Sequence, residues 1–203
     1  LTVPAGWWAG RRLFGTASGW ATAALLATVP FLTYYAQETR MYALAVLIGL
    51  LAAAMFAAVF ALRQRQLLPL FVLFGALAPY THNWGLFLLI GCGVGWLVLI
   101  KLAEPADRRL LVRDGLLGFG LIALLYAPWL PTLLDQARHT GAPWAEQPKA
   151  EAIINILEVT LGGTGTGLAV ALVGSIGLLR MREAERERAR AALAHVTVLL
   201  VTG

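Results

Sequence analysis

Between two long apolar runs, residues 34–42 read Tyr-Tyr-Ala-Gln-Glu-Thr-Arg-Met-Tyr. The run before this stretch covers residues 17–35, and the run after it covers residues 41–62. Glu38 and Arg40 therefore lie between two segments that are apolar enough to sit in lipid, where an ionisable side chain is costly. Charged groups in such a place usually mark a cavity, a pathway or a ligand site.

The composition indicates a membrane protein. Hydrophobic residues make up 59% of the 203 residues and charged residues only 13%, and the mean hydropathy is +0.73. A helix needs about 20 apolar residues to cross a hydrocarbon core of about 30 Å, and the runs lack the alternation of an outer-membrane barrel. We therefore expect an all-α polytopic bundle of about 6–7 transmembrane spans. The further apolar runs cover residues 66–80, 84–100, 115–130, 159–179 and 191–203.

Lys and Arg fall mostly on one side of these predicted spans. Only Arg40, Arg138 and Lys149 of the 16 basic residues fall on the other side. The positive-inside rule places the majority side in the cytoplasm. The same bias explains a pI near 9.9 without a nucleic-acid partner, because anionic lipid would meet the excess charge. The majority side carries Arg11, Arg12, Arg63, Arg65, Lys101, Arg108, Arg109, Arg113, Arg180, Arg182, Arg186, Arg188 and Arg190.

The two ends of the chain suggest an internal fragment, so that residues 1–203 form a partial transmembrane domain. The chain opens on Leu1 rather than Met and stops inside an apolar run. Residues 1–9 resemble the tail of a preceding span that ends at a basic turn over residues 10–12. The single cysteine, Cys92, lies inside an apolar run and gives no disulfide or metal signature.

The predicted topology sorts the polar interruptions onto one outer face. They fall at residues 37–40, at residues 80–84 and in a long extracytoplasmic segment over residues 131–158. Because all three connect spans on the same side, we expect them to converge. Ionisable groups at that depth tend to line a ligand site.

Arg40 has two interpretations. As an interfacial residue it would only extend its side chain to the lipid headgroups. However, it opens a helix, whose positive N-terminal end gains nothing from a cation, and an anion would relieve that conflict. A guanidinium beside free helix-start amides suits a phosphate. Glu38 would either orient Arg40 or accept a hydrogen bond from a sugar hydroxyl, and we favour orientation.

His82 and Asn83 form a second polar interruption. A single histidine near the interface is often only hydrogen-bonded to a neighbouring helix, but an imidazole also donates to phosphate or assists proton transfer. No second histidine lies at ligand spacing, so a metal site is not indicated. Interfacial positions explain most of the nearby aromatic residues, although one or two of them would also stack on a sugar.

The third interruption begins with Pro128 and Pro131, which predict a helix exit. A short polar helix is expected over residues 135–139, which include Asp135, Gln136, Arg138 and His139. An amphipathic helix that lies on the membrane is expected over residues 150–161. The run Gly-Gly-Thr-Gly-Thr-Gly at residues 162–167 lacks the lysine and the preceding strand of a nucleotide loop, which favours a flexible hinge.

Taken in order, these segments resemble a known family. Residues 35–44 (Tyr-Ala-Gln-Glu-Thr-Arg-Met-Tyr-Ala-Leu), residues 80–83 (Tyr-Thr-His-Asn) and residues 128–131 (Pro-Trp-Leu-Pro) are similar to bacterial polytopic glycosyltransferases of the GT-C class. Those enzymes are relatives of protein O-mannosyltransferases and of the lipid A aminoarabinose transferase. The similarity covers nearly the whole chain, and its most specific element is Gln-Glu-x-Arg-x-Tyr.

The resemblance implies inverting transfer of a hexosyl or pentosyl sugar from a polyprenyl-phosphate donor to an acceptor. The site would face the extracytoplasmic side of a bacterial inner (cell) membrane. The catalytic acidic residue is expected in a first outer loop upstream of this chain, so that the fragment alone is expected to be inactive. No cofactor is implied, and divalent-metal dependence stays open. The expected substrate-binding residues are Gln37, Glu38, Arg40, Tyr42, His82 and Asn83.

Two other classes of protein remain as alternatives. A multi-span transporter or lipid flippase would place ionisable groups within its spans and often shows duplicated halves, which this sequence lacks. A non-catalytic membrane subunit would explain the topology but would leave Arg40 and the long outer segment without a role. An Asp or Asp-Glu pair shortly after the first span of the intact protein would favour the transferase.

Overall fold

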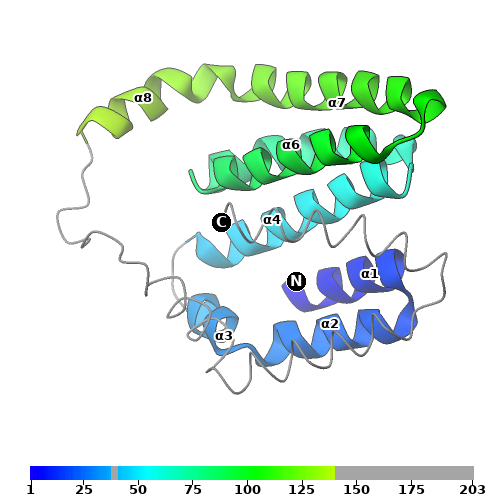
Figure 1. The fold of residues 1–203 in the computed structure, drawn as a ribbon. Coiled ribbons are helices and arrows are strands. Elements are labelled where there is room, and N and C mark those ends of the chain that lie inside the picture. Colours follow the sequence, from blue (N-terminus) through cyan, green and yellow to red (C-terminus); the bar gives the residue numbers. More distant parts are fainter. Residues whose placement is uncertain (38–40, 140–203) are drawn as a thin grey trace, which may run out of the picture.

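The computed structural model describes residues 1–37 and 41–139, and within these residues the chain is helical and contains no strand (Figure 1). This confirms the all-α class. In chain order the elements are α1 (Thr2–Phe14), α2 (Thr16–Thr28), α3 (Pro30–Gln37), α4 (Tyr42–Phe56), the π-helical turn η1 (Ala57–Ala61), the 3-10 turn η2 (Arg65–Leu67), α5 (Leu68–Thr81), α6 (Gly85–Leu102), α7 (Pro105–Tyr126), the 3-10 turn η3 (Ala127–Trp129) and α8 (Leu130–His139).

Three helical stretches are long and apolar enough to cross a membrane: Tyr42–Ala61, Gly85–Leu102 and Pro105–His139. They agree with three of the predicted runs in length and apolar character. The total of 6–7 spans is not confirmed. Helices α1, α2 and α5 have 13, 13 and 14 residues, so each is about 20 Å long at 1.5 Å per residue. The predicted runs 159–179 and 191–203 and the predicted amphipathic helix 150–161 lie outside the described residues.

The predicted single helix over residues 17–35 is wrong. Two helices, α2 and α3, occupy this run and meet at Val29, whose backbone is extended (φ −63°, ψ 120°). The cause is Pro30, because the ring of a proline disfavours the helical conformation in the residue before it. Its effect is invisible in the hydropathy of the run, and it lets α3 turn away from α2.

The predicted basic turn at residues 10–12 is also wrong. Helix α1 continues to Phe14, with Arg11 and Arg12 in its last turn, and the chain reverses at Gly15. Gly15 has φ 99°, a conformation that side chains with a Cβ rarely adopt. The glycine, and not the charged pair, therefore sets the position of the turn.

Helix α7 begins ten residues before the predicted 115, at Pro105. Proline is tolerated in the first turn of a helix, where its missing N–H would have no helical partner. The predicted helix exit agrees with the end of α7 at Tyr126. Pro128 lies in η3 and Pro131 near the start of α8, so the chain leaves α7 through one tight turn. Helix α8 then includes the short polar helix predicted over residues 135–139.

Phenylalanine rings pack the centre of the bundle. Phe60 lies 4.9 Å from Phe56 and 5.4 Å from Phe71, measured between ring centroids, and Phe119 of α7 lies 5.4 Å from Phe71. Phe56, Phe60 and Phe71 are fully buried. These edge-to-face and tilted contacts join α4, α5 and α7.

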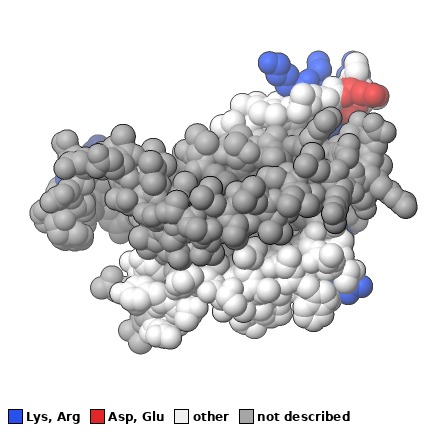
Figure 2. Space-filling view, turned by 60° about the horizontal axis from the view of Figure 1, so that its bottom comes forward, with Lys and Arg blue, Asp and Glu red and all other residues white. Residues whose placement is uncertain are grey.

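The basic residues gather at one end of the bundle. There the end of α1, the connection between α4 and α5 and the connection between α6 and α7 lie together (Figures 1 and 2). Arg12 donates to Gln64, and Arg63 lies 3.6 Å from Asp107. We call this end the cationic end. It holds the eight described members of the predicted cytoplasmic group: Arg11, Arg12, Arg63, Arg65, Lys101, Arg108, Arg109 and Arg113.

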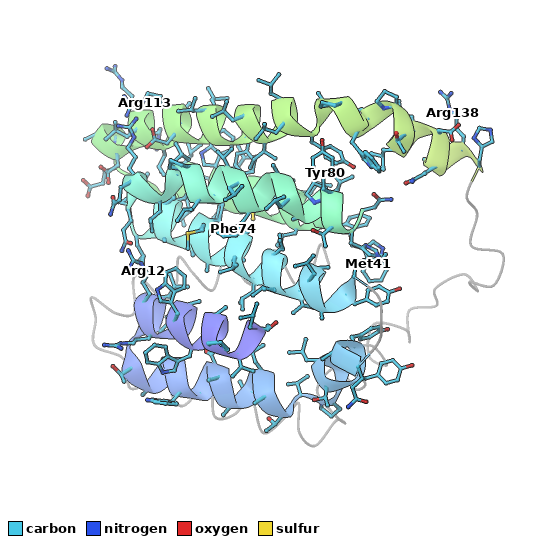
Figure 3. All side chains as sticks on the ribbon, turned by 180° about the vertical axis from the view of Figure 1, so that it is seen from behind. Arg12, Met41, Phe74, Tyr80, Arg113 and Arg138 are labelled. Carbon is cyan, nitrogen blue, oxygen red and sulfur yellow. The ribbon has the colours of Figure 1, made fainter. Side chains whose placement is uncertain are left out.

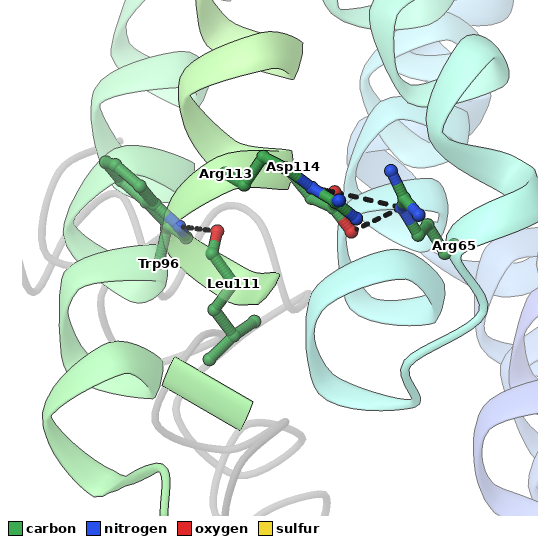
Figure 4. Close-up of polar contacts among 5 residues, drawn as sticks. All are labelled: Arg65, Trp96, Leu111, Arg113 and Asp114. Carbon is green, nitrogen blue, oxygen red and sulfur yellow. Dashed lines mark hydrogen bonds and ion pairs between the residues drawn. The ribbon is translucent and has the colours of Figure 1, made fainter. Parts of the chain in front are cut away.

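A buried carboxylate organises the cationic end (Figure 4). Asp114 of α7 is only 7% exposed. Its oxygens lie 2.9 Å from Nε of Arg65 and 3.3 Å from Nε of Arg113. One turn away, Nε1 of Trp96 donates to the carbonyl of Leu111 at 2.9 Å. These bonds tie α7 to η2 and to α6, so Asp114 stabilises the bundle.

Candidate functional site: an aromatic cavity at the opposite end

A cavity of about 300 Å³ opens at the end of the bundle away from the cationic end. The last turn of α3, the first two turns of α4 and the short connection between α5 and α6 enclose it (Figure 3). We call it the aromatic cavity. Its walls include Tyr35, Tyr42, Ala45, Val46, His82 and Trp84.

Four rings form a continuous chain along this cavity. The ring centroids of Tyr35 and Tyr42 are 4.9 Å apart, those of Tyr42 and His82 are 5.8 Å apart, and those of His82 and Trp84 are 5.2 Å apart. The residues come from α3, α4 and the connection between α5 and α6. Edge-to-face contacts of this kind stabilise the arrangement beyond the burial of the rings. They fix the connection between α5 and α6 against α3 and α4, about 40 residues earlier in the chain.

The backbone holds the imidazole of His82 in one tautomer. His82 ends α5 with an extended backbone (φ −157°, ψ 136°). The backbone N–H of Trp84 donates to its Nδ1 at 3.1 Å. Since Nδ1 accepts this bond, the proton of the neutral ring is on Nε2. His82 is therefore a hydrogen-bond donor through Nε2 in the wall of the cavity.

Gly85 allows the tight connection that carries His82 and Trp84. A Cβ at this position would lie 2.4 Å from the carbonyl carbon of Ala78 and 2.5 Å from the nitrogen of Pro79. The start of α6 thus touches the backbone of α5 directly. Pro79 lies inside α5 and has no N–H to donate to the carbonyl one turn earlier. The close contact brings His82 against α4.

A second cavity, of about 370 Å³, adjoins the first. Tyr35 and Val46 line both cavities and separate them. The second cavity lies between the start of α1, the end of α2 and the start of α4, and its walls are largely aliphatic, for example Leu26 and Leu32. The first half of α4 therefore has open space on two sides.

The structure brings together some of the predicted substrate-binding residues. Tyr42 and His82 line the aromatic cavity. Gln37 is exposed at the end of α3 and lines neither cavity. Asn83 is exposed as well, and its amide donates to Oε1 of Gln136 at 3.3 Å, toward α8. Glu38 and Arg40 lie outside the described residues, between Gln37 and Met41 in the sequence.

Two cavity residues escaped the sequence prediction. Tyr35 and Trp84 are among the aromatic residues that the sequence explains mostly by interfacial positions, without choosing which of them would stack on a sugar, and Trp84 is 71% exposed. A feature of α4 distinguishes them from interfacial residues. Ala45 and Gly49 follow Tyr42 at helical spacing, and these two small residues lie beneath the aromatic rings. That stripe leaves the space that the rings border.

The predicted third segment meets this end of the bundle as far as the structure describes it. Tyr80 donates to the carbonyl of Leu125 at 2.9 Å. Its ring lies 5.3 Å from that of Tyr126 and 5.8 Å from that of Trp129. These contacts join the end of α5 to the end of α7 and to η3, and the bond between Asn83 and Gln136 joins the connection between α5 and α6 to α8. Residues 140–158 lie outside the described residues.

Within residues 1–37 and 41–139, no group of three or more His, Cys, Asp or Glu side chains is arranged to hold a metal ion. No protein-family model, no curated protein and no solved structure matches this chain. The chemistry of the aromatic cavity therefore has to be inferred from its own residues and their surroundings.

Proposed function

We propose that the aromatic cavity binds the head of a polyprenyl-phosphate sugar, and that the chain is part of a membrane glycosyltransferase. The observation that carries this proposal is the position of an aromatic, imidazole-bearing cavity at the end of membrane-spanning helices, opposite the cationic end. A lipid-linked sugar presents its phosphate and sugar at that level while its chain stays in the bilayer.

The cavity walls suit the parts of such a donor. In our proposal the faces of the Tyr and Trp rings contact the apolar face of a sugar or the first isoprene units, and Nε2–H of His82 donates to a phosphate oxygen. The adjoining aliphatic cavity offers room for the start of the lipid chain. Arg40, two residues before Tyr42 in the sequence, supplies a guanidinium in our proposal, because planar paired donors match phosphate.

The reaction we propose is a single inverting displacement. The acceptor oxygen attacks the anomeric carbon, and the bond between that carbon and the phosphate oxygen breaks. The electron pair leaves with the phosphate, and a base takes the proton of the acceptor. Arg40 and His82 would stabilise the charge that grows on the phosphate, with Glu38 orienting Arg40. The resemblance to GT-C glycosyltransferases implies that this base is an acidic residue upstream of this chain.

Donor binding tests the proposal without requiring transfer. The chain would be purified in lipid nanodiscs and titrated with a polyprenyl phosphate that carries radiolabelled mannose. We expect Arg40→Ala to weaken binding about 10-fold to 100-fold, the range for a lost charge-assisted hydrogen bond. Arg40→Lys should restore part of the affinity, since an ammonium keeps the charge but loses the paired donors.

Arg138→Ala is the matched control, because Arg138 is a cation on the same predicted face, on α8, and lines neither cavity. It should bind the donor as the unmodified chain does. Unchanged binding by Arg40→Ala, or an equal loss in Arg138→Ala, would contradict the assigned role of Arg40. If the donor failed to bind even the unmodified chain, the glycosyltransferase proposal itself would be overturned.

A further inference from the structure

The outward face of α7 carries cations at one end and apolar side chains along its length, which suits a phospholipid. Its inward face is formed by buried residues such as Leu111, Gly118 and Ile122. On the opposite face, Arg109 and Arg113 are one turn apart at the cationic end, where Figure 3 labels Arg113, and exposed leucines follow them along α7. Cations above an apolar stripe match a charged head above a hydrocarbon chain. The exposed leucines are Leu116 (64%), Leu117 (47%), Leu121 (39%) and Leu124 (68%).

Gly120 interrupts this apolar stripe. It is exposed, and a Cβ built on it would meet nothing within 4 Å among the residues that the structure describes. Neither a turn nor a close helix contact therefore explains a residue that costs a helix interior about 1 kcal/mol relative to alanine. Between Leu117 and Leu124, on the same face by helical spacing, the missing side chain leaves a shallow notch in which a hydrocarbon chain can lie.

The charges of the two guanidiniums at the cationic end of the stripe are not fully paired by the residues that the structure describes. Arg109 has no ion-pair partner among the residues that the structure describes. Arg113 contacts Asp114 through Nε alone, at 3.3 Å, and Asp114 is already held by Arg65 at 2.9 Å. Half of the Arg113 side chain is exposed. The pair therefore has donors to offer to an anion outside the protein.

The length of the stripe fits one leaflet of a bilayer. Eleven residues separate Arg113 from Leu124, which is about 16 Å along a helix. The hydrocarbon core is about 30 Å thick, so one leaflet contributes about 15 Å. An acyl chain that starts at the level of Arg113 would end near Leu124.

We propose that the outward face of α7 is a binding site for one anionic phospholipid. The phosphate lies between Arg109 and Arg113, and an acyl chain follows Leu117, Gly120 and Leu124. This site is separate from the aromatic cavity, which lies at the other end of the bundle, and does not depend on its function.

Native mass spectrometry of the purified chain tests this site. The chain in detergent would be offered an equimolar mixture of dioleoyl phosphatidylglycerol and dioleoyl phosphatidylcholine, and the ratio of the two bound lipids would be measured. We expect each of Arg109→Gln and Arg113→Gln to lower the preference for phosphatidylglycerol about fivefold, the usual effect of one cation near anionic lipid. Arg109→Gln leaves the contacts of Asp114 intact, so its result does not depend on the stability of the bundle.

Two further variants make the test specific to α7. Arg11→Gln combined with Lys101→Gln also removes two cations from the cationic end, but away from this face, and should keep the preference. Gly120→Phe fills the notch without changing charge and should lower the retained phosphatidylglycerol at least threefold. Equal loss in the Arg11 and Lys101 control, or an unchanged ratio in Arg109→Gln combined with Arg113→Gln, would overturn the proposal.

Discussion

Asp114 illustrates how a single buried charge is accommodated in an apolar helix. Its carboxylate is nearly buried and lies between two half-exposed guanidiniums. A buried ion adds stability only while its partners remain, because the cost of removing it from water has to be offset by those bonds. The sequence predicts an apolar helix only from residue 115, because charged residues next to an apolar run usually indicate a loop. Pairing across helices is not visible in the sequence.

This arrangement predicts that the loss of the Asp114 charge costs more stability than the loss of the Asp107 charge. Asp114→Asn leaves Arg65 and Arg113 without their counter-charge and should destabilise the chain by about 1–3 kcal/mol. Asp107→Asn removes a more exposed carboxylate, 3.6 Å from Arg63, and should cost less than about 1 kcal/mol. Thermal unfolding of both variants in the same nanodiscs measures the difference. Equal losses would mean that Asp114 does not organise the cationic end.

His82 accepts a structural hydrogen bond at Nδ1 and, in our proposal, donates a second one to the bound phosphate from Nε2. Asparagine at this position can accept the N–H of Trp84 as Nδ1 does but has no group in place of Nε2. We expect His82→Asn to lower the unfolding temperature of the chain only slightly, through the lost ring contacts with Tyr42 and Trp84, and to weaken polyprenyl-phosphate binding about 3-fold to 10-fold, the range for one neutral hydrogen bond. Titration with the labelled donor measures the affinity. An unchanged affinity would remove His82 from the donor site.

At the scale of elements, the sequence predicted the long apolar helices and missed their ends. The runs 41–62 and 84–100 agree with Tyr42–Ala61 and Gly85–Leu102, because twenty apolar residues leave few alternatives. The break at Val29 was missed, since hydropathy does not register the effect of Pro30 on the residue before it. The start of α7 was missed because a run of charged residues usually indicates a loop, whereas here these residues are helical and Asp114 is paired with Arg65 of η2.

The connection between α5 and α6 provides a prediction at this scale. Gly85→Ala places a methyl group against the backbone of Ala78 and Pro79, so α6 has to move away from α5. We expect a loss of about 1–3 kcal/mol together with weaker donor binding. Gly93→Ala is the matched control on α6, because a Cβ there meets nothing within 4 Å. It should leave both quantities unchanged or raise stability slightly. Identical behaviour of the two variants would contradict the close contact.

At the scale of the whole molecule, the bundle has two chemically different ends. The cationic end was predictable from the count of Lys and Arg, and its members do lie together. The aromatic cavity was predictable only in part. Tyr42 and His82 follow from the polar interruptions, whereas the cavity that Tyr35 and Trp84 border forms only because the ring of Tyr42 meets that of His82, 40 residues later in the sequence. Sequence spacing carries no record of such contacts.

The two ends should face opposite sides of the membrane. In a Cys92→Ala background, which removes the single, buried cysteine, Asn83→Cys and Lys101→Cys each place a thiol at one end. An impermeant maleimide should label Asn83→Cys in intact cells and Lys101→Cys only after lysis. The reverse pattern would place the aromatic cavity in the cytoplasm and would contradict an extracytoplasmic transfer site.

Photo-crosslinking tests the central claim most directly. A polyprenyl-phosphate sugar with a diazirine on the first isoprene unit would be irradiated with the chain in nanodiscs, and the modified residues would be located by peptide mass spectrometry. We expect crosslinks around Tyr35, at the start of α4 and in the connection between α5 and α6, with competition by unlabelled donor. Crosslinks confined to the cationic end or to the outward face of α7, or crosslinks that unlabelled donor does not reduce, would contradict the assignment of the aromatic cavity as the donor site.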